Sequence, residues 1–252
     1  MSVEIGGKYT NSEAMSEAER IQNKVPNNGE AEAEDYREAD TIVDLENETA
    51  AKLHKKWQED FRINNNGHND RFKPAGDDPN WEERIENVEF TEEGEIVINR
   101  GTAKEATLSV LKSPDGKIAK YLDPDGKNVM YLDILNTDYP DLSEQWKNDN
   151  RMAAESALTI VKKHEGDFGP DDIEKISAAV HQAFLDRRKA EGAYIPEEQD
   201  LPYGDLPDKK EDGITPVSGG KEADRVIVNT ALEVIEEAAK RADAKVEEDV
   251  AG

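Results

Sequence analysis

The chain has 252 residues, of which 36% are charged and 35% hydrophobic, and its formal net charge is −26. A surface this acidic repels phosphate, so the charge argues against generic binding to nucleic acid or anionic membranes and favours a basic partner. The absence of cysteine excludes disulfides, a thiol nucleophile and thiolate metal sites. There is no run of 18 apolar residues and no apolar signal core near the N-terminus, so we expect a soluble, cytoplasmic protein.

The N-terminal third of the chain begins with residues that have little to bury. Residues 1–34 are polar and acidic and predict a flexible N-terminal arm. Residues 35–62 predict a helix, because apolar side chains recur every three or four positions between Ile42 and Phe61. The Asn-, Gly-, Asp- and Pro-rich residues 63–80 predict a loop.

The middle of the chain has the pattern of strands. Residues 85–134 alternate in polarity, carry β-branched side chains, and contain the turn sequences SPDG and DPDG. We expect a small antiparallel sheet of three to five strands. Because its strands hold few large apolar groups, the sheet should pack on a helical body.

Helical periodicity returns in the rest of the chain. Helices are predicted over residues 136–164, 172–190 and 221–247, separated by loops rich in Gly and Pro. Ser143 and the run Pro170-Asp171-Asp172 are typical of helix starts. The predicted fold class is therefore mainly α with a small antiparallel β insertion, an α+β protein.

One order of residues occurs twice along the chain. A helix with His54 and Trp57 precedes the sequence YPDL and a helix that opens with Lys147-x-x-Asn-Arg151. A helix with His181 and Phe184 likewise precedes YGDL and a helix that opens with Lys-x-x-Asp-Arg225. Four matches in one order indicate an internal duplication. We therefore expect two similar helical modules packed together, residues 35–84 with 135–164 and residues 165–248, with residues 85–134 inserted into the first.

The repeated pattern resembles the RyR domain, the helical module of ryanodine receptors that also occurs in bacterial and phage proteins. The first copy keeps the family's His-x-x-Trp, Tyr-x-x-Leu and Lys-x-x-x-Arg, while Asn150 replaces an Asp and Ser143 a Pro. The second copy keeps Leu206-Pro207 and Asp224-Arg225, but Phe184 replaces the Trp, and its turn Glu191-Gly192-Ala193-Tyr194 has lost another Trp. The resemblance covers half to two-thirds of the chain and excludes the arm and the sheet.

The resemblance implies a non-catalytic ligand-binding or regulatory protein that needs no cofactor. Its small, nucleotide-like ligand would lie between the helix with the histidine and the helix with the arginine. The ligand-binding residues that it implies are His54, Trp57, Tyr139, Arg151, His181, Tyr194, Tyr203 and Arg225.

Each of these residues also has a purely structural interpretation. His54 and Trp57 either belong to the core or line a pocket in which an aromatic side chain stacks on a ring. Arg151 and Arg225 either pair with some of the 58 acidic residues or present a fork to a phosphate or carboxylate. The tyrosines are either packed or in contact with ligand. The four histidines are scattered without HxH or HxxxH spacing, and DPDG lacks the pattern of a calcium loop, so no metal site is predicted.

Other functions compete with ligand binding. The net charge of −26 favours an acidic protein–protein interaction or structural protein, such as an adaptor or virion component with a basic partner. A nucleic-acid mimic would need carboxylates spaced like phosphates along one face. An enzyme comes last, because the sequence has no G-x-S-x-G, Walker, Rossmann or zinc motif and no catalytic residues are predicted.

Overall fold

The computed structural model describes residues 31–64, 69–76, 87–99, 105–122, 126–164, 168–209 and 219–251. The chain divides into two compact units, residues 1–44 and 45–252. The predicted acidic arm lies outside the described residues, except for residues 31–34, which are helical. All packing described below belongs to the second unit.

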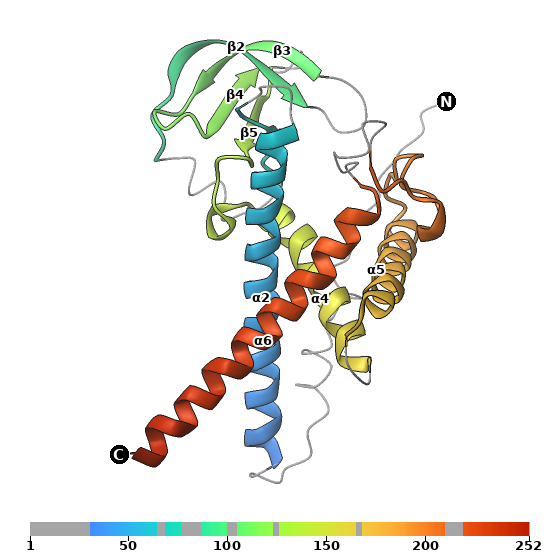
Figure 1. The fold of residues 1–252 in the computed structure, drawn as a ribbon. Helices are drawn as coiled ribbons and strands as arrows, with labels where there is room; N and C mark the ends of the chain where they lie inside the picture. The colour runs from blue at the N-terminus through green and yellow to red at the C-terminus, as the bar shows by residue number, and fades with distance from the viewer. Residues whose placement is uncertain are drawn as a thin grey trace, which may run out of the picture. The chain divides into compact units, whose positions relative to one another are not determined.

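Long α-helices form where the hydrophobic periodicity predicted them. They are α2 (Ala31–Asn64), α4 (Glu144–Lys163), α5 (Pro170–Ala190) and α6 (Lys221–Ala251) (Figure 1). The four helix predictions are thereby confirmed, although α4 begins later than expected. Short 3-10 turns, η1 (Tyr139–Asp141) and η2 (Tyr203–Asp205), coincide with the YPDL and YGDL sequences.

The helix starts follow from local chemistry. Ser143 is the extended residue before α4, and its carbonyl accepts hydrogen bonds from the backbone N–H groups of Trp146 and Lys147, both at 3.0 Å. In α5, Pro170 occupies the first turn, where its missing N–H costs nothing. The Asp172 carboxylate in that turn accepts a hydrogen bond from the Gly169 N–H at 3.3 Å.

The part of the chain between α2 and α4 closes into a barrel. Its strands are β1 (Phe72–Pro74), β2 (Thr91–Asn99), β3 (Glu105–Lys112), β4 (Ile118–Leu122) and β5 (Asn128–Asp133). Strands β2 to β5 pair antiparallel in chain order, and they form the green part of Figure 1. Strand β1 closes the barrel by pairing antiparallel with β5 and parallel with β2.

The predicted fold class, mainly α with a small antiparallel β insertion, is wrong. The β part is a closed five-stranded barrel with its own core, and one of its pairings is parallel. Its closing strand comes from residues 63–80, which were predicted to be a loop. A three-residue strand carries too little local pattern to be recognised, and it pairs with strands far away in the sequence. Closure removes the exposed edges that an open sheet would have left.

Separate apolar cores hold the barrel and the helices. The barrel core contains Phe72, Ile96, Ile98, Val110, Ala119 and Tyr131. A second core joins α4, α5 and α6 through Ala157, Leu158, Val161, Ile176, Val180, Val228 and Ala231. A third joins α2 and α4 to the end of the barrel through Ala50, Leu53, Ala75, Leu132, Ile134, Tyr139, Leu142 and Ala154.

A row of polar side chains also fastens α2 to the chain that leaves the barrel. His54, Gln58 and Arg62 stand four residues apart, so they project from one face of the helix. His54 Nε2 and Gln58 Nε2 each lie 2.9 Å from the carbonyl oxygen of Thr137, and Arg62 donates to the Leu135 carbonyl at 2.8 Å. Residues 135–137 thus hold α2 and the barrel together.

Among the helices that the structure describes, none is both long enough and apolar enough to cross a membrane.

Replacing Ile98 by alanine tests whether the barrel is a packed structural unit. Ile98 is fully buried in the barrel core, so Ile98→Ala should lower the free energy of unfolding by about 2–5 kcal/mol. Urea denaturation measures this loss. Val97 lies next to it on the opposite face of β2 and is half-buried, so Val97→Ala should cost about 1 kcal/mol or less. Equal losses for the two variants would contradict a barrel with a packed interior.

Candidate functional site

The two histidines of the repeated pattern make the same contact. His54 Nε2 lies 2.9 Å from the Thr137 carbonyl oxygen, and His181 Nε2 lies 2.9 Å from the Leu201 carbonyl oxygen. Each carbonyl precedes by two residues the tyrosine that opens η1 or η2. The ring centroids of His54 and Tyr139 are 6.5 Å apart, and those of His181 and Tyr203 are 6.3 Å apart.

The aromatic residues three positions after the histidines also correspond. The Trp57 ring lies 5.5 Å from His54 at an interplanar angle of 24°, and the Phe184 ring lies 6.2 Å from His181 at 34°. Matching contacts of this kind are what a duplicated unit should have. The duplication and the resemblance to the RyR domain themselves stay predictions.

Below, the first half means the predicted module of residues 35–84 and 135–164, and the second half means that of residues 165–248. In the second half, carboxylates neutralise the arginine of the pattern. Arg225 pairs with Glu174 at 2.5 Å, with Asp208 at 2.6 Å and with Glu222 at 3.3 Å. The Tyr203 hydroxyl donates to Glu174 at 3.0 Å, and burial together with this carboxylate raises the pKa of Tyr203 to about 12. Arg225 therefore holds α6 to α5.

The second histidine is also committed to partners within the protein. His181 and Asp224 are both buried, and His181 Nδ1 lies 3.1 Å from Asp224 Oδ2. Because a carbonyl only accepts, His181 Nε2 must carry a hydrogen. Burial raises the pKa of Asp224 to about 6, against the opposing effect of His181. Tyr194, by contrast, is 57% exposed.

The first half of the chain contains a pocket beside its histidine. We call this cavity of about 270 Å³ the tryptophan pocket. It lies between α2, β1 with the residue before it, the turns that follow β5, and α4. Its lining residues are His54, Trp57, Arg71, Lys73, Ile134, Leu142, Trp146, Asp149 and Asn150.

Two cations meet in the tryptophan pocket. The Arg71 guanidinium lies 4.6 Å from the Phe61 ring and 5.8 Å from the Trp57 ring. Its Nε is buried without a hydrogen-bond partner, and no carboxylate among the described residues forms an ion pair with it. Burial lowers the pKa of Arg71 and that of Lys73, and the charge of Arg71 lowers the pKa of Lys73 further. The pocket thus brings two cationic side chains together with one carboxylate, that of Asp149, in a chain of net charge −26.

Backbone hydrogen bonds fix the position of Arg71. Its N–H donates to the buried Asp133 carboxylate at 2.9 Å, and its carbonyl accepts from the Ile134 N–H at 3.0 Å. Because side chains alternate along a strand, Phe72 enters the barrel core while Arg71 and Lys73 both point to the other side. The same three residues therefore close the barrel and charge the pocket.

Indole rings from two helices supply the aromatic part of the lining. Trp57 comes from α2 and Trp146 from α4, and both are half-buried. The Trp146 Nε1–H donates to the Pro74 carbonyl at 2.8 Å, which anchors this ring at the end of β1. Asn150 donates to the Trp146 carbonyl at 3.0 Å. Asp149 also lines the pocket, and burial raises the pKa of its carboxyl group against the opposing charges of Arg188 and Arg187.

The structure brings only two of the eight predicted ligand-binding residues into this pocket, His54 and Trp57. Tyr139 is buried in the core beside His54, and Arg151 pairs with Glu144 at 2.5 Å. The four predicted residues of the second half, His181, Tyr194, Tyr203 and Arg225, do not line it. Sequence reasoning missed Arg71 and Lys73 as site residues, although two cations at strand spacing in the sequence DRFKP were a usable signal.

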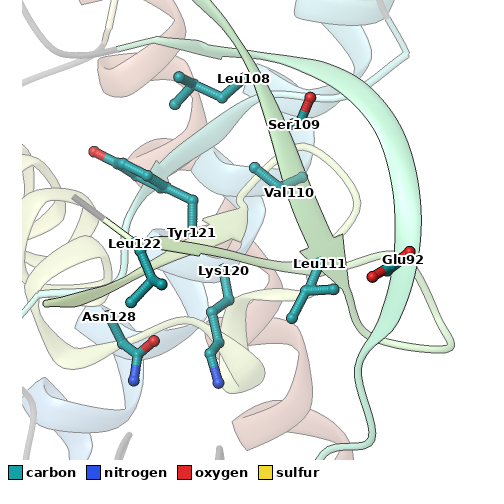
Figure 2. A pocket seen from close by; sticks show the side chains of 9 residues that line it. All are labelled: Glu92, Leu108, Ser109, Val110, Leu111, Lys120, Tyr121, Leu122 and Asn128. Atoms are coloured by element: carbon teal, nitrogen blue, oxygen red, sulfur yellow. The ribbon is translucent and has the colours of Figure 1, made fainter. Parts of the chain in front are cut away.

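A second hollow, here called the barrel groove, lies where β3 and β4 separate (Figure 2). These strands pair only at Leu111 with Lys120 and Lys112 with Ala119. The groove has a volume of about 580 Å³ and is lined by Glu92, Leu108, Ser109, Val110, Leu111, Lys120, Tyr121, Leu122 and Asn128. Four of the nine lining residues are aliphatic, and one lysine and one glutamate accompany them, so the groove offers apolar surface but no concentration of charge of one sign.

Within the described part of the chain, no group of three or more metal-ligating side chains is placed to hold a metal ion. Comparison of the chain with protein-family models, with curated proteins and with solved structures finds no match.

The hydrogen bond of His54 leads to a prediction about pH. Burial lowers the pKa of His54, more than Asp138 and the Thr137 carbonyl raise it. The unfolded chain therefore takes up a proton below about pH 6.5 that the folded protein resists, and stability that is present above this pH is lost as the pH falls. His54→Gln removes this proton uptake.

Free energies of unfolding, measured by urea denaturation between pH 7.5 and 5, test this prediction. The stability advantage of the wild type over His54→Gln should shrink as the pH falls. Trp57→Phe, which disturbs the same packing without removing a titrating group, should keep a constant difference from the wild type. A His54→Gln difference that stays constant or grows toward pH 5 would contradict a buried, neutral His54.

Proposed function

We propose that this chain is a non-catalytic, ligand-binding regulatory protein built of two RyR-like modules, and that it binds a nucleotide-like ligand in the tryptophan pocket. The observation that carries the proposal is the meeting of two desolvated cations, Arg71 and Lys73, with the two indole rings of Trp57 and Trp146 in one small cavity.

Each part of a nucleotide has a matching feature in this lining. A guanidinium forms paired, charge-assisted hydrogen bonds with phosphate oxygens, and a lysine adds a point charge. Indole rings offer flat apolar surfaces for a base. The surrounding acidic surface disfavours polyanions such as DNA, so only an enclosed positive site would hold a small anion.

The size of the pocket narrows the ligand further. Drug-sized ligands occupy pockets of about 300–1,000 Å³, and the tryptophan pocket, at about 270 Å³, lies just below that range. A mononucleotide therefore suits it better than a dinucleotide or ADP-ribose, part of which would extend into solvent.

Binding without catalysis is favoured by the state of His54. Its Nε2 is held by the Thr137 carbonyl and its pKa is lowered, so it is a poor general acid near neutral pH. We also propose that the protein acts in the cytoplasm, which cell fractionation would test.

An acidic protein–protein interaction or structural protein is the second candidate. The barrel groove supports it, because Leu122 is 66% exposed beside other apolar residues and such surface is typical of protein contacts. The net charge of −26 would then select a basic partner.

A thermal-shift screen with 5′-mononucleotides and the matching nucleosides tests the first candidate. A ligand at a hundred times its dissociation constant adds about 2.7 kcal/mol to stability. Arg71→Gln should weaken binding about tenfold or more, because a hydrogen bond to a charged group contributes about 1.5–3 kcal/mol. Nucleosides, which lack the phosphate, should bind more weakly to the wild type and be less affected by Arg71→Gln.

Lys55→Gln is the matched control. Lys55 is exposed on α2 next to His54, so its replacement removes the same charge without altering the pocket lining. It should leave the nucleotide response unchanged. If no mononucleotide stabilises a cooperatively melting wild type, or if Arg71→Gln and Lys55→Gln respond alike, nucleotide binding in this pocket is wrong and the acidic interaction protein becomes the better candidate.

A further inference from the structure

The two halves of the chain differ at one position next to the histidine. In the second half, the residue before the arginine of the pattern is Asp224, and its carboxylate contacts His181 Nδ1 at 3.1 Å. In the first half, the corresponding residue is Asn150. Asn150 and His54 both line the tryptophan pocket, and no hydrogen bond joins them in the described part of the structure. The first half thus has a cavity in the region where the second has an anion.

The proton positions of the two histidines make this difference chemically specific. Both Nε2 atoms face backbone carbonyls, so both carry hydrogen. His181 has a carboxyl group of the protein at Nδ1. Among the described residues, no carboxylate forms an ion pair with His54 Nδ1, and in the neutral ring this atom is an unprotonated acceptor.

We propose that the phosphate group of the ligand lies against Nδ1 of His54, in the position that the Asp224 carboxylate occupies against His181, with Arg71 and Lys73 beside it. This inference rests on the proposed function and specifies how that ligand is held. In the second half, the anion at the histidine is the Asp224 carboxylate of the protein itself. In the first half, it is the phosphate of the ligand.

Proton uptake should accompany binding. A phosphate at Nδ1 favours the charged imidazolium, so the pKa of His54 should rise when the site is occupied. The proton comes from solvent or from the phosphate itself, whose second ionisation also lies near pH 6. The charged and titratable groups around His54 are Arg62 of α2, Asp138 and Tyr139 of the turn before α4, Arg71 and Lys73 at β1, and Asp149 of α4. Of these, Arg62 opposes protonation of His54 and Asp138 favours it.

The test uses the full chain, with inorganic phosphate as the probe, and records the titration of the histidine Cε1–H signals by NMR. The chain has four histidines, and the signal missing from His54→Gln assigns His54. In the wild type, phosphate should raise the pKa of His54 by about 1, a tenfold gain in proton affinity, while chloride at the same ionic strength should not.

Asn150→Asp places the carboxylate of the second half into the first. The pKa of His54 should then be raised without phosphate, phosphate should have little further effect, and binding of AMP should weaken tenfold or more. Asn150→Ala removes the same amide without adding a charge, so it should keep the response to phosphate. Phosphate that leaves His54 unmoved in the wild type, or that moves it equally in Asn150→Asp, would overturn the inference.

Nucleotide binding in the pocket and the phosphate contact with His54 can be tested separately. If mononucleotides stabilise the protein in an Arg71-dependent way but His54 does not respond, the nucleotide site stands and the contact with His54 falls. If His54 responds to phosphate but no mononucleotide stabilises the protein, the anion contact stands and the nucleotide function falls.

Discussion

The carbonyl oxygen of Thr137 is the point on which the arrangement of the first half depends. It accepts hydrogen bonds from both His54 and Gln58 of α2, and it lies between the last barrel strand and the turn that leads into α4. A buried carbonyl left without donors costs about 1–3 kcal/mol, so the two side chains hold helix and barrel exit together. The tryptophan pocket exists because α2, the barrel and α4 are held side by side at this point.

The helices could be predicted from sequence because their evidence is local. Apolar residues at helical spacing and start signals such as Pro170-Asp171-Asp172 are contained within a few turns. Barrel closure is different, since Phe72 pairs with Asp133 and Ile98, which lie far along the chain. No local pattern predicts that pairing. The predicted fold class was therefore wrong, although strands were expected in the right region.

The candidate site was predictable only in part, for the same reason. His54 and Trp57 share one helix and could be recognised by their spacing. Arg71 and Lys73 became site residues through the path of β1, and the remaining lining through the packing of α4. Arg151 and Arg225 shared the predicted motif, but each has carboxylate partners nearby in space. In so acidic a chain, the informative observation is that Arg71 has no ion pair with a carboxylate of the described residues, and it depends on tertiary structure.

The consecutive residues Arg71, Phe72 and Lys73 have a consequence for how this protein tolerates change. Phe72 completes the barrel interior, while its neighbours on either side line the pocket. Barrel stability and ligand affinity therefore depend on the same short segment, so a substitution there that changes one should also change the other. An occupied pocket would shield this segment from local opening, so amide hydrogen exchange at β1 and at its partner β5 would slow together on binding. Here a strand of three residues, together with the residue before it, both closes the barrel and lines the pocket.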